Sequence, residues 1–460
     1  MSASPWVTSL QAEELVEPTL EVRSHLLDLE STSEPVSEPT GELTMEVIPP
    51  VTSGLTLEVS AKISAESHLS ESPLFDMKLE TAPMSEATEV AVSQTLYVTG
   101  YPVYFRRDAE DELIELIISS VTQRDPDVDQ PKAPSTLIIV SDEVVARLYS
   151  GPLVGALQRR GFKAHLLTFP AGDKSKSLRV LEALATQMLK LGVNRDDLLI
   201  ALGGGVTGDL CGLLAALYMR GVKWAQVPTS LLAQVDSSVG AKTAVNHPLG
   251  KNLLGAFYRP EWVWVDVDYI WTLPPRELRA GLAEALKHGL IADASLFSTL
   301  VALGHLSPQT DKDREQWRIA LRRAVKVKAS IVERDERERG ERALLNFGHT
   351  FGHAFETCSA ELLHGEAVAL GIALSLEYSA CYGELSREAL TAAIEALSSV
   401  ELSIDWRSHL SDAVWSAIAL DKKRTSDKLK FIVLREIGEA YIEEVTIEEL
   451  SSRVKALVHL

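Results

Sequence analysis

The stretch DLLIALGGGVTGD, residues 197–209, joins an apolar run to a glycine-rich turn, and a helical pattern follows it. A short apolar run that ends in glycine is typical of a buried strand, here residues 197–202. Glycines at a strand-to-helix turn let the backbone approach a phosphate, and the helix N-terminus adds N–H donors. A plain tight turn would need the same glycines, and the run is not a GxGxxG fingerprint after a first strand. The stretch therefore favours a nucleotide site, with Asp209 as a candidate ribose or nicotinamide contact.

On both sides of this stretch, apolar runs alternate with helical patterns. The helical patterns cover residues 143–161 and 176–192, and each separates two apolar runs. Units of strand, helix and strand spaced in this way indicate a parallel sheet with helices on its faces. We therefore predict an α/β, Rossmann-like, nucleotide-binding domain over residues 94–270. Its strands are expected at residues 95–105 (a first strand or hairpin), 136–141, 163–169, 197–202 and 262–267.

The densest polar segment of the chain begins at Arg220 and continues through residues 226–257. A solvated loop could share this composition, but long structureless loops are uncommon in compact domains. Several cations and hydroxyls beside small residues suit a polyhydroxylated, anionic ligand. The polar side chains that the segment combines are Thr229, Ser230, Asp236, Ser237, Ser238, Lys242, Lys251 and Asn252.

Beyond residue 271 the pattern is almost wholly helical, and we predict a helical metal- and substrate-binding domain over residues 271–460. Glu284 and Lys287 lie three apart on one face of a predicted helix. Such a pair is usually a surface salt bridge of little consequence. Because the neighbouring residues are small or apolar, we expect this pair to be buried and functional. Near the C-terminus, residues 421–445 predict a charged loop and a hairpin, and a last helix follows.

The stretch LLNFGHTFGHAFETCSAELLHGE, residues 344–366, holds three of the 11 histidines in the chain. His349 and His353 lie four apart and share one helix face, and His364 can fold back after a short break. Neutral imidazole is the commonest zinc ligand, and one further oxygen ligand would leave a position for substrate. A core helix could also carry such a pair. Three histidines, flanked by an arginine and an asparagine, favour a metal site, with Glu284 as the oxygen ligand.

A charged run precedes the histidines and ends a long predicted helix at residues 325–340. Such a run is normally a solvated helix face. Its closeness in sequence to the histidines favours a functional role for Glu338. The helix brings a set of polar residues together: Lys328, Asp335 and Glu338, close to Arg342 and Asn346.

Composition narrows the classes of protein and of partner. The 460-residue chain carries a formal net charge of −20, which argues against nucleic acid or an anionic membrane as the main partner. Its three cysteines are widely spaced, which indicates a reducing compartment and no cysteine-built metal site. No apolar run approaches the roughly 20 residues of a membrane helix. Residues 1–93 are rich in Ser, Thr, Glu and Pro, and we predict a disordered acidic extension. It lacks the features of a secretory signal and fits an organellar transit peptide badly, so we expect a cytoplasmic protein, with a plastid as the alternative.

Taken together, these motifs resemble the 3-dehydroquinate synthase family, whose members are NAD- and metal-dependent cyclases. The resemblance runs from about Thr95 to the C-terminus and leaves residues 1–93 unexplained. It rests on six segments in the order of the family: GGGVTGD (203–209), YMRGVKWAQVPTSLLAQVDSSVGAKTAVNHPLGKNLLGAF (218–257), LPPRELRAGLAEALKHG (273–289), LNFGHTFGHAFE (345–356), LHGEAV (363–368) and DKK (421–423).

The resemblance implies a metal site and a cofactor site. The metal ligands would be Glu284, His349 and His364, around Zn²⁺ or, as an alternative, Co²⁺. His353 then becomes an acid/base or substrate-binding residue, which revises its first interpretation as a co-ligand. The NAD contacts would come from Asp142, Asp173, Lys176, Gly204, Gly205, Val206, Asp209, Thr229, Ser230, Lys251, Tyr269, Ile270, Trp271 and Thr272.

The resemblance also implies a substrate, a sugar acid phosphate, and a homodimer in which Arg220 reaches the phosphate across the interface. Glu338 and His353 are the expected general acid and base, assisted by Lys242, Asn252 and Lys287. The substrate would be held by Asp236, Lys242, Asn252, Lys287, Lys328, Arg342, Asn346, His349, His364, Arg220 and one lysine of the pair Lys422 and Lys423.

The family's reaction is the second step of the shikimate pathway. It converts 3-deoxy-D-arabino-heptulosonate 7-phosphate (DAHP) to 3-dehydroquinate and phosphate. NAD oxidises one carbinol and later returns the hydride, while the metal acts as a Lewis acid. The new carbonyl acidifies the neighbouring C–H, so phosphate can leave.

Four departures from the family pattern are visible, and one is Asp173, where the family usually has glutamate. Ala241 replaces a second glycine before Lys242, and Ser230 replaces a more usual threonine. The segment between His353 and His364 is about one residue shorter than the family's. None of these changes removes a chemical group from the expected site.

The sequence alone leaves three rival interpretations of the function open. Sister sugar phosphate cyclases close sedoheptulose 7-phosphate or glucose 6-phosphate with the same cofactors, but they have no carboxylate to bind. A metal-dependent polyol dehydrogenase of related fold would lack the phosphate-binding cations. A non-catalytic regulatory paralogue would not need intact metal, base and phosphate residues.

Overall fold

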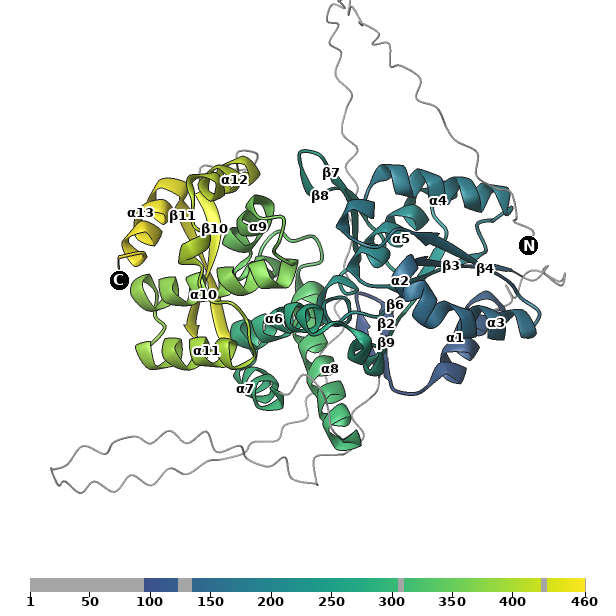
Figure 1. Cartoon of the computed structure of the whole chain (residues 1–460), viewed down its shortest axis with the longest axis horizontal. Helices are drawn as coiled ribbons and strands as arrows, with labels where there is room; N and C mark the ends of the chain where they lie inside the picture. Colours follow the sequence, from purple (N-terminus) through teal and green to yellow (C-terminus); the bar gives the residue numbers. More distant parts are fainter. Residues whose placement is uncertain (1–94, 123–134, 305–309, 423–427, 460) are drawn as a thin grey trace, which may run out of the picture. The chain divides into compact units, whose positions relative to one another are not determined.

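The computed structural model describes residues 95–122, 135–304, 310–422 and 428–459 (Figure 1). The predicted acidic extension, residues 1–93, and Lys423 lie outside the described residues. Residues 84–460 form one compact unit, and the text below concerns this unit alone. The predicted division of this unit at residues 270 and 271 stays a prediction.

A seven-stranded sheet forms the first half of the described chain, in the order β1-β2-β9-β6-β5-β3-β4. All neighbours are parallel except β1 and β2, which form an antiparallel hairpin. Each predicted strand is confirmed within two residues of its expected ends, and β6 adds one that was not predicted. The bounds are β1 Thr95–Val98, β2 Tyr101–Arg106, β3 Thr136–Asp142, β4 Lys163–Phe169, β5 Leu198–Gly203, β6 Lys223–Pro228 and β9 Val263–Asp266.

Helices cover both faces of this sheet because successive side chains of a strand point to opposite faces. Leu137 and Ile139 pack with α1 (Glu110–Thr122) and α3 (Gly151–Arg159) on one face. The alternate positions Ile138 and Val140 pack with α4 (Leu178–Lys190) and α5 (Gly205–Leu217) on the other. The sheet is therefore buried on both sides, as the continuous apolar runs of its strands predict.

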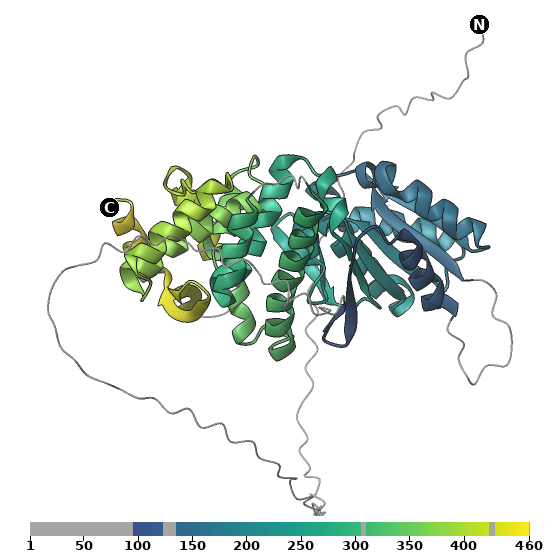
Figure 2. The same cartoon turned by 90° about the horizontal axis from the view of Figure 1, so that it is seen from below.

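The second half is mainly helical, as predicted (Figure 2), and it also contains the expected hairpin of β10 and β11 (Figure 1). Helix α10 lies at its centre, and its side chains are buried around the whole helix over residues 367–376. The core that surrounds α6 and α8 also includes strand residues Val103 and Val265, so one apolar core joins the two halves. The bounds are α6 Pro275–Ala292, α7 Ala294–Leu303, α8 Asp311–Arg334, α9 His349–Cys358, α10 His364–Tyr382, α11 Arg387–Ser399, α12 Asp412–Lys422, α13 Ile447–Leu457, β10 Lys428–Glu436 and β11 Glu439–Thr446.

The polar segment that was expected as one long functional loop is more regular than its composition suggests. It begins with a single helical turn, η5 (Ala233–Ser237), and continues as an antiparallel hairpin of β7 (Lys242–His247) and β8 (Gly250–Phe257). Thr243 and Val245 of β7 are buried while most of β8 is exposed, so only one strand shows a clear alternation. Among the described residues, no helix combines the length and the apolar character that crossing a bilayer demands.

Candidate active site

The candidate cofactor residues lie where parallel strands of the sheet end. Gly204 precedes α5, which has no side-chain cap, so the first N–H groups of this helix remain available to a ligand. The turn after β6 lies directly beside it, because the Thr229 N–H donates to the Gly203 carbonyl oxygen at 3.0 Å. A Cβ on Gly204 would lie 3.2 Å from Ser230 Oγ, so a side chain here would crowd the neighbouring turn. Two backbone turns thus meet at the carboxyl edge of the sheet, where open α/β folds bind nucleotides.

The other cofactor candidates fall into two groups. Asp142 ends β3 and caps the next helix by accepting from the N–H groups of Val144 and Val145. The segment η6 (Val267–Thr272) holds the four aromatic, apolar and hydroxyl candidates. The Tyr149 ring lies 4.7 Å from the Tyr269 ring, and its hydroxyl contacts Thr272 at 2.5 Å. Among the described residues, neither group forms a side-chain hydrogen bond, ion pair or ring contact with the other candidate cofactor residues.

Lys176 connects the cofactor turn to the hairpin. Its ammonium group is almost fully buried and pairs with the carboxylate of Asp209 and the side-chain oxygen of Asn252. Burial raises the pKa of Asp209, although the charge of Lys176 opposes this shift. Three residues that were predicted separately therefore form one polar contact set, which links α5 to β8.

Three further predicted residues form the candidate metal centre. Glu284 of α6 has a fully buried side chain, and its Oε1 lies 3.3 Å from His349 Nε2 and 3.4 Å from His364 Nε2. Its other oxygen, Oε2, lies 2.5 Å from the ammonium nitrogen of Lys287. Burial raises the pKa of Glu284, but Lys287 and the two imidazoles outweigh it and hold that pKa well below its usual range. One carboxylate and two imidazoles that converge in this way are a donor set suited to zinc.

Glycines let the helices approach closely enough to bring these donors together. Gly365 follows His364, and a Cβ there would lie 1.8 Å from the Ala280 carbonyl oxygen in α6. Gly348 precedes His349 with φ of 78°, in the left-handed region, and a Cβ on it would clash with α10 at 2.7 Å. The ends of α9 and α10 that carry the histidines can therefore pack against α6 and against each other.

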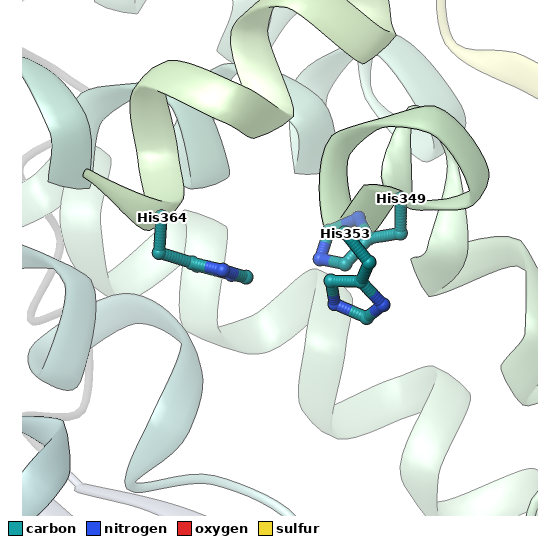
Figure 3. Close-up of side chains that lie close together, drawn as sticks. All are labelled: His349, His353 and His364. Carbon is teal, nitrogen blue, oxygen red and sulfur yellow. The ribbon is translucent and has the colours of Figure 1, made fainter. Parts of the chain in front are cut away.

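His353 lies beside this centre on the next turn of α9. Figure 3 shows His364 pointing toward His349 and His353 from the start of α10. The ring centres of His349 and His353 are 5.1 Å apart, and one nitrogen from each of the three histidines lies within 4.8 Å of the others. Desolvation within the histidine cluster, together with His349 and His364, lowers the pKa of His353 to about 3, although much of the residue remains exposed. His353 is therefore neutral near pH 7.

The candidate substrate residues form two contact sets, and the first adjoins the metal centre, because ligand atoms of Asp236, Glu284 and His288 lie within 4.8 Å of one another. In the first, Lys328 donates to the Asp236 carboxylate at 2.6 Å, and His288 Nε2 lies 3.5 Å from the same oxygen. In the second, Lys242 pairs with Glu338, which also accepts from the Asn346 side chain at 3.0 Å. Burial raises the pKa of Glu338, but Lys242 and Asn346 outweigh it, and the net pKa is lowered. Glu338 is therefore ionised near pH 7.

Several of these residues hold strained backbone. Ala241, Asn252 and Glu338 have φ of 56°, 55° and 57°, in the left-handed region that L-residues avoid. Arg342 stabilises the backbone next to Ala241, because its guanidinium donates to the Gly240 carbonyl oxygen at 3.2 Å. Strain of this kind concentrates at functional sites, where the surrounding structure maintains it. The Ala241 departure noted in the sequence is thus tolerated, and the backbone keeps a glycine-like conformation.

Some predicted residues are not joined to the site by contacts. Arg220 ends η4 (Tyr218–Arg220) with φ of 68° and an exposed side chain, which forms no hydrogen bond or ion pair with another described residue. Asp335 accepts from backbone N–H groups of residues 339, 340 and 342, so it shapes the turn that carries Glu338. Lys422 ends α12, and Lys423 lies outside the described residues.

Two residues in contact with the site were missed in the sequence. Glu356 lies on α9 and contacts both His364 and Lys251, and His288 lies on α6 beside Asp236. A signal existed for Glu356, since positions 349, 353 and 356 repeat at helical spacing and share one face of α9. No comparable signal existed for His288, because its partner comes from a distant part of the chain.

Comparisons with known proteins identify the family of the chain. Residues 166–280 match the family model "3-dehydroquinate synthase N-terminal", and residues 281–424 match "3-dehydroquinate synthase C-terminal". A 3-dehydroquinate synthase from Thermodesulfovibrio yellowstonii is 40% identical over 316 residues, which cover 68% of this chain and 88% of the relative. One from Cereibacter sphaeroides is 44% identical over 314 residues, which cover 66% of this chain and 84% of the relative.

Solved structures show the same architecture. ValA, a 2-epi-5-epi-valiolone synthase from Streptomyces hygroscopicus subsp. jinggangensis with NAD+ and Zn2+ bound, is 28% identical, with a TM-score of 0.67 over 79% of this chain and 98% of that one. A 2-deoxy-scyllo-inosose synthase shares the fold, with 24% identity and a TM-score of 0.65 over 77% of this chain and 96% of that one. The predicted fold class is confirmed, and the chain belongs to the 3-dehydroquinate synthase family.

Proposed function

We propose that this protein is a 3-dehydroquinate synthase, which converts DAHP to 3-dehydroquinate and phosphate. The observation that carries the proposal is the convergence of Glu284, His349 and His364, next to two sets of cationic and carboxylate side chains. The family membership and the identity of 40% to 44% with named 3-dehydroquinate synthases support the same activity.

The donor set fits a zinc ion held by Glu284, His349 and His364, with Co²⁺ as an alternative metal. The open helix N-terminus at Gly204 and the cationic Lys176 and Lys251 fit NAD at the edge of the sheet. When bound, the metal would supply Lewis-acid polarisation of substrate oxygens, and NAD would supply a hydride acceptor that is regenerated in each turnover.

The remaining chemistry belongs to the side chains. Lys287, Lys328 and Arg342 would hold the phosphate and carboxylate of the substrate, because they place positive charge in a buried region. Glu338 and His353 would act as proton acceptors, since both are unprotonated near neutral pH for the reasons given above. Asp236 would accept a hydrogen bond from a substrate hydroxyl while Lys328 balances its charge.

The test supplies purified protein with zinc, NAD and DAHP, and measures phosphate and 3-dehydroquinate. We expect both products, and we expect Glu284→Ala to abolish them. Sedoheptulose 7-phosphate is assayed in parallel. Turnover of that substrate alone would keep the mechanism and overturn the substrate, and a silent protein that binds zinc and NAD would favour a non-catalytic paralogue.

We also propose a homodimer in which Arg220 reaches the phosphate site of the partner subunit. The exposed guanidinium of Arg220 and the adjoining exposed apolar side chains of Leu217 and Met219 support this arrangement. Light scattering should give twice the chain mass, and Arg220→Ala should raise KM for DAHP more than it lowers kcat. A monomer with full activity would contradict the proposal.

We propose a cytoplasmic location, with a plastid as the alternative. All three cysteines are free, and Cys358 and Cys381 are exposed, which suits a reducing compartment. Imaging of the full chain, tagged at its C-terminus, should show diffuse cytoplasmic signal.

A further inference from the structure

Glu356 lies between the candidate metal centre and the candidate cofactor site. It belongs to α9, one turn beyond His353, and its side chain is only 8% exposed. Its Oε1 accepts from the Lys251 ammonium at 2.8 Å, and its Oε2 lies 3.1 Å from His364 Nδ1. A single carboxylate therefore contacts one residue of each site.

The contact with His364 determines which ring nitrogen of that imidazole is available to a metal ion. Its two ring nitrogens face different carboxylates: Nε2 lies 3.4 Å from Glu284, and Nδ1 lies 3.1 Å from Glu356. If the proton resides on Nδ1 and is donated to Glu356, the lone pair of Nε2 is directed toward the centre at Glu284. A carboxylate behind a metal-binding histidine commonly fixes its tautomer and its ring orientation in this way.

The contact with Lys251 extends the chain of contacts to the hairpin. Lys251 of β8 also lies 3.4 Å from Asp173, on the turn after β4. Asp173 in turn accepts from the Asn246 side chain of β7 at 3.0 Å. The hairpin, the turn after β4 and α9 are thus joined through the Lys251 ammonium.

We infer that Glu356 is a positioning residue that couples metal binding to cofactor binding, and this inference rests on the proposed function. By holding His364 it orders one metal ligand, and by holding Lys251 it orders one cofactor contact. A ligand at either site removes part of the ordering cost of the other, so zinc and NAD should each raise the affinity of the protein for the other.

The first experiment measures zinc affinity by competition with a chromophoric chelator, in the full chain without substrate. We expect Glu356→Gln to weaken zinc binding by about 10- to 100-fold, the range typical of partners behind metal ligands. Glu361→Gln is the matched control, because it removes the same charge from an exposed side chain nearby and should leave the affinity unchanged. Glu356→Asp keeps the charge and should recover part of the loss.

The second experiment measures NAD binding by calorimetry, with and without zinc. In the wild-type protein zinc should tighten NAD binding, and in both Glu356→Gln and Lys251→Met this gain should fall to less than half. Lys251→Met does not touch the metal ligands, so it tests the coupling even if Glu356→Gln folds poorly.

The outcomes separate the two proposals. Zinc binding by the wild-type protein but not by Glu284→Ala would support the metal site of the proposed function. If the zinc affinity of Glu356→Gln then lies within twofold of the wild-type value, the positioning role is overturned and the proposed function stands. If zinc leaves NAD affinity unchanged in the wild-type protein, the coupling is overturned. A wild-type protein that binds no zinc overturns both proposals.

Discussion

Ala241 shows how a single residue stores strain beside the candidate substrate site. Its φ of 56° costs an L-residue roughly 1 kcal/mol more than it costs glycine. We therefore expect Ala241→Gly to raise the free energy of unfolding by up to about 1 kcal/mol, less a few tenths for the greater freedom of the unfolded chain.

Urea denaturation of the two proteins checks this expectation. The control is Ala244→Gly in β7, the strand that follows Ala241, which should lower the stability by about 0.5–1 kcal/mol because its backbone is ordinary. Equal destabilisation by both substitutions would contradict the strain at Ala241.

Glu338 offers a test of local electrostatics. Burial alone would raise its pKa, but Lys242 and Asn346 lower the net value. The carboxylate is thus ionised above its lowered pKa and loses its charge as the pH falls through that value. We expect Lys242→Met to raise the pKa of Glu338, so the acid limb of the pH profile of kcat/KM should move to higher pH.

Lys242→Arg is the companion variant, because it keeps the positive charge at this position. Its acid limb should stay close to that of the wild type, although its rate falls. An unmoved limb in Lys242→Met would show that Glu338 does not control the profile.

At the scale of helices, the close approach of α10 to α6 determines the metal centre. A Cβ on Gly365 would overlap the Ala280 carbonyl, so Gly365→Ala must push the start of α10 away from Glu284. We expect a loss of about 1–3 kcal/mol in unfolding free energy and a loss of at least tenfold in zinc affinity.

Denaturation and chelator competition on the same sample measure both effects. Gly151→Ala is a suitable control, because no atom lies within 4 Å of the added Cβ at the start of α3. Unchanged zinc affinity in Gly365→Ala would mean that helix contact does not set the geometry of the centre.

The secondary-structure elements also show how much of the fold could be predicted from the sequence. The strands of the sheet other than β6, and the helices α6, α8 and α13, were predictable, because long apolar runs and helical spacing are local signals. The hairpin of β7 and β8 was missed, because exposed β8 lacks the alternation that marks a strand. The contacts of Glu356 and His288 depend on which elements meet in space, and the left-handed backbone at Ala241 has no signature in an alanine. The residues themselves suggested Glu284 as the oxygen ligand beside three histidines, and the family resemblance then selected His349 and His364 as the two imidazole ligands.

At the scale of the whole molecule, metal binding should contribute measurable stability. A ligand that binds only the folded chain stabilises it by about 2.7 kcal/mol at 100 times its dissociation constant. We expect zinc at that excess to raise the unfolding free energy of the full chain by about this amount, and a strong chelator to remove the gain.

Urea titrations with and without zinc measure the gain. Glu284→Ala should show none of it, because it removes the buried ligand at the centre of the donor set. An equal gain in that variant would place the zinc elsewhere in the chain.

The candidate metal ligands come from α6, α9 and α10. Along the chain, the whole of α7 and α8 lies between α6 and the other two helices. During folding, contacts between such distant positions form late, because closing the intervening loop costs entropy before any contact offsets it. A folding intermediate that has built α6 alone holds one ligand, and one that has built only α9 and α10 holds two. The rate of zinc binding during refolding, measured by stopped flow, would therefore report the rate at which α9 and α10 pack onto α6. Zinc binding would thus measure the rate of this late folding step.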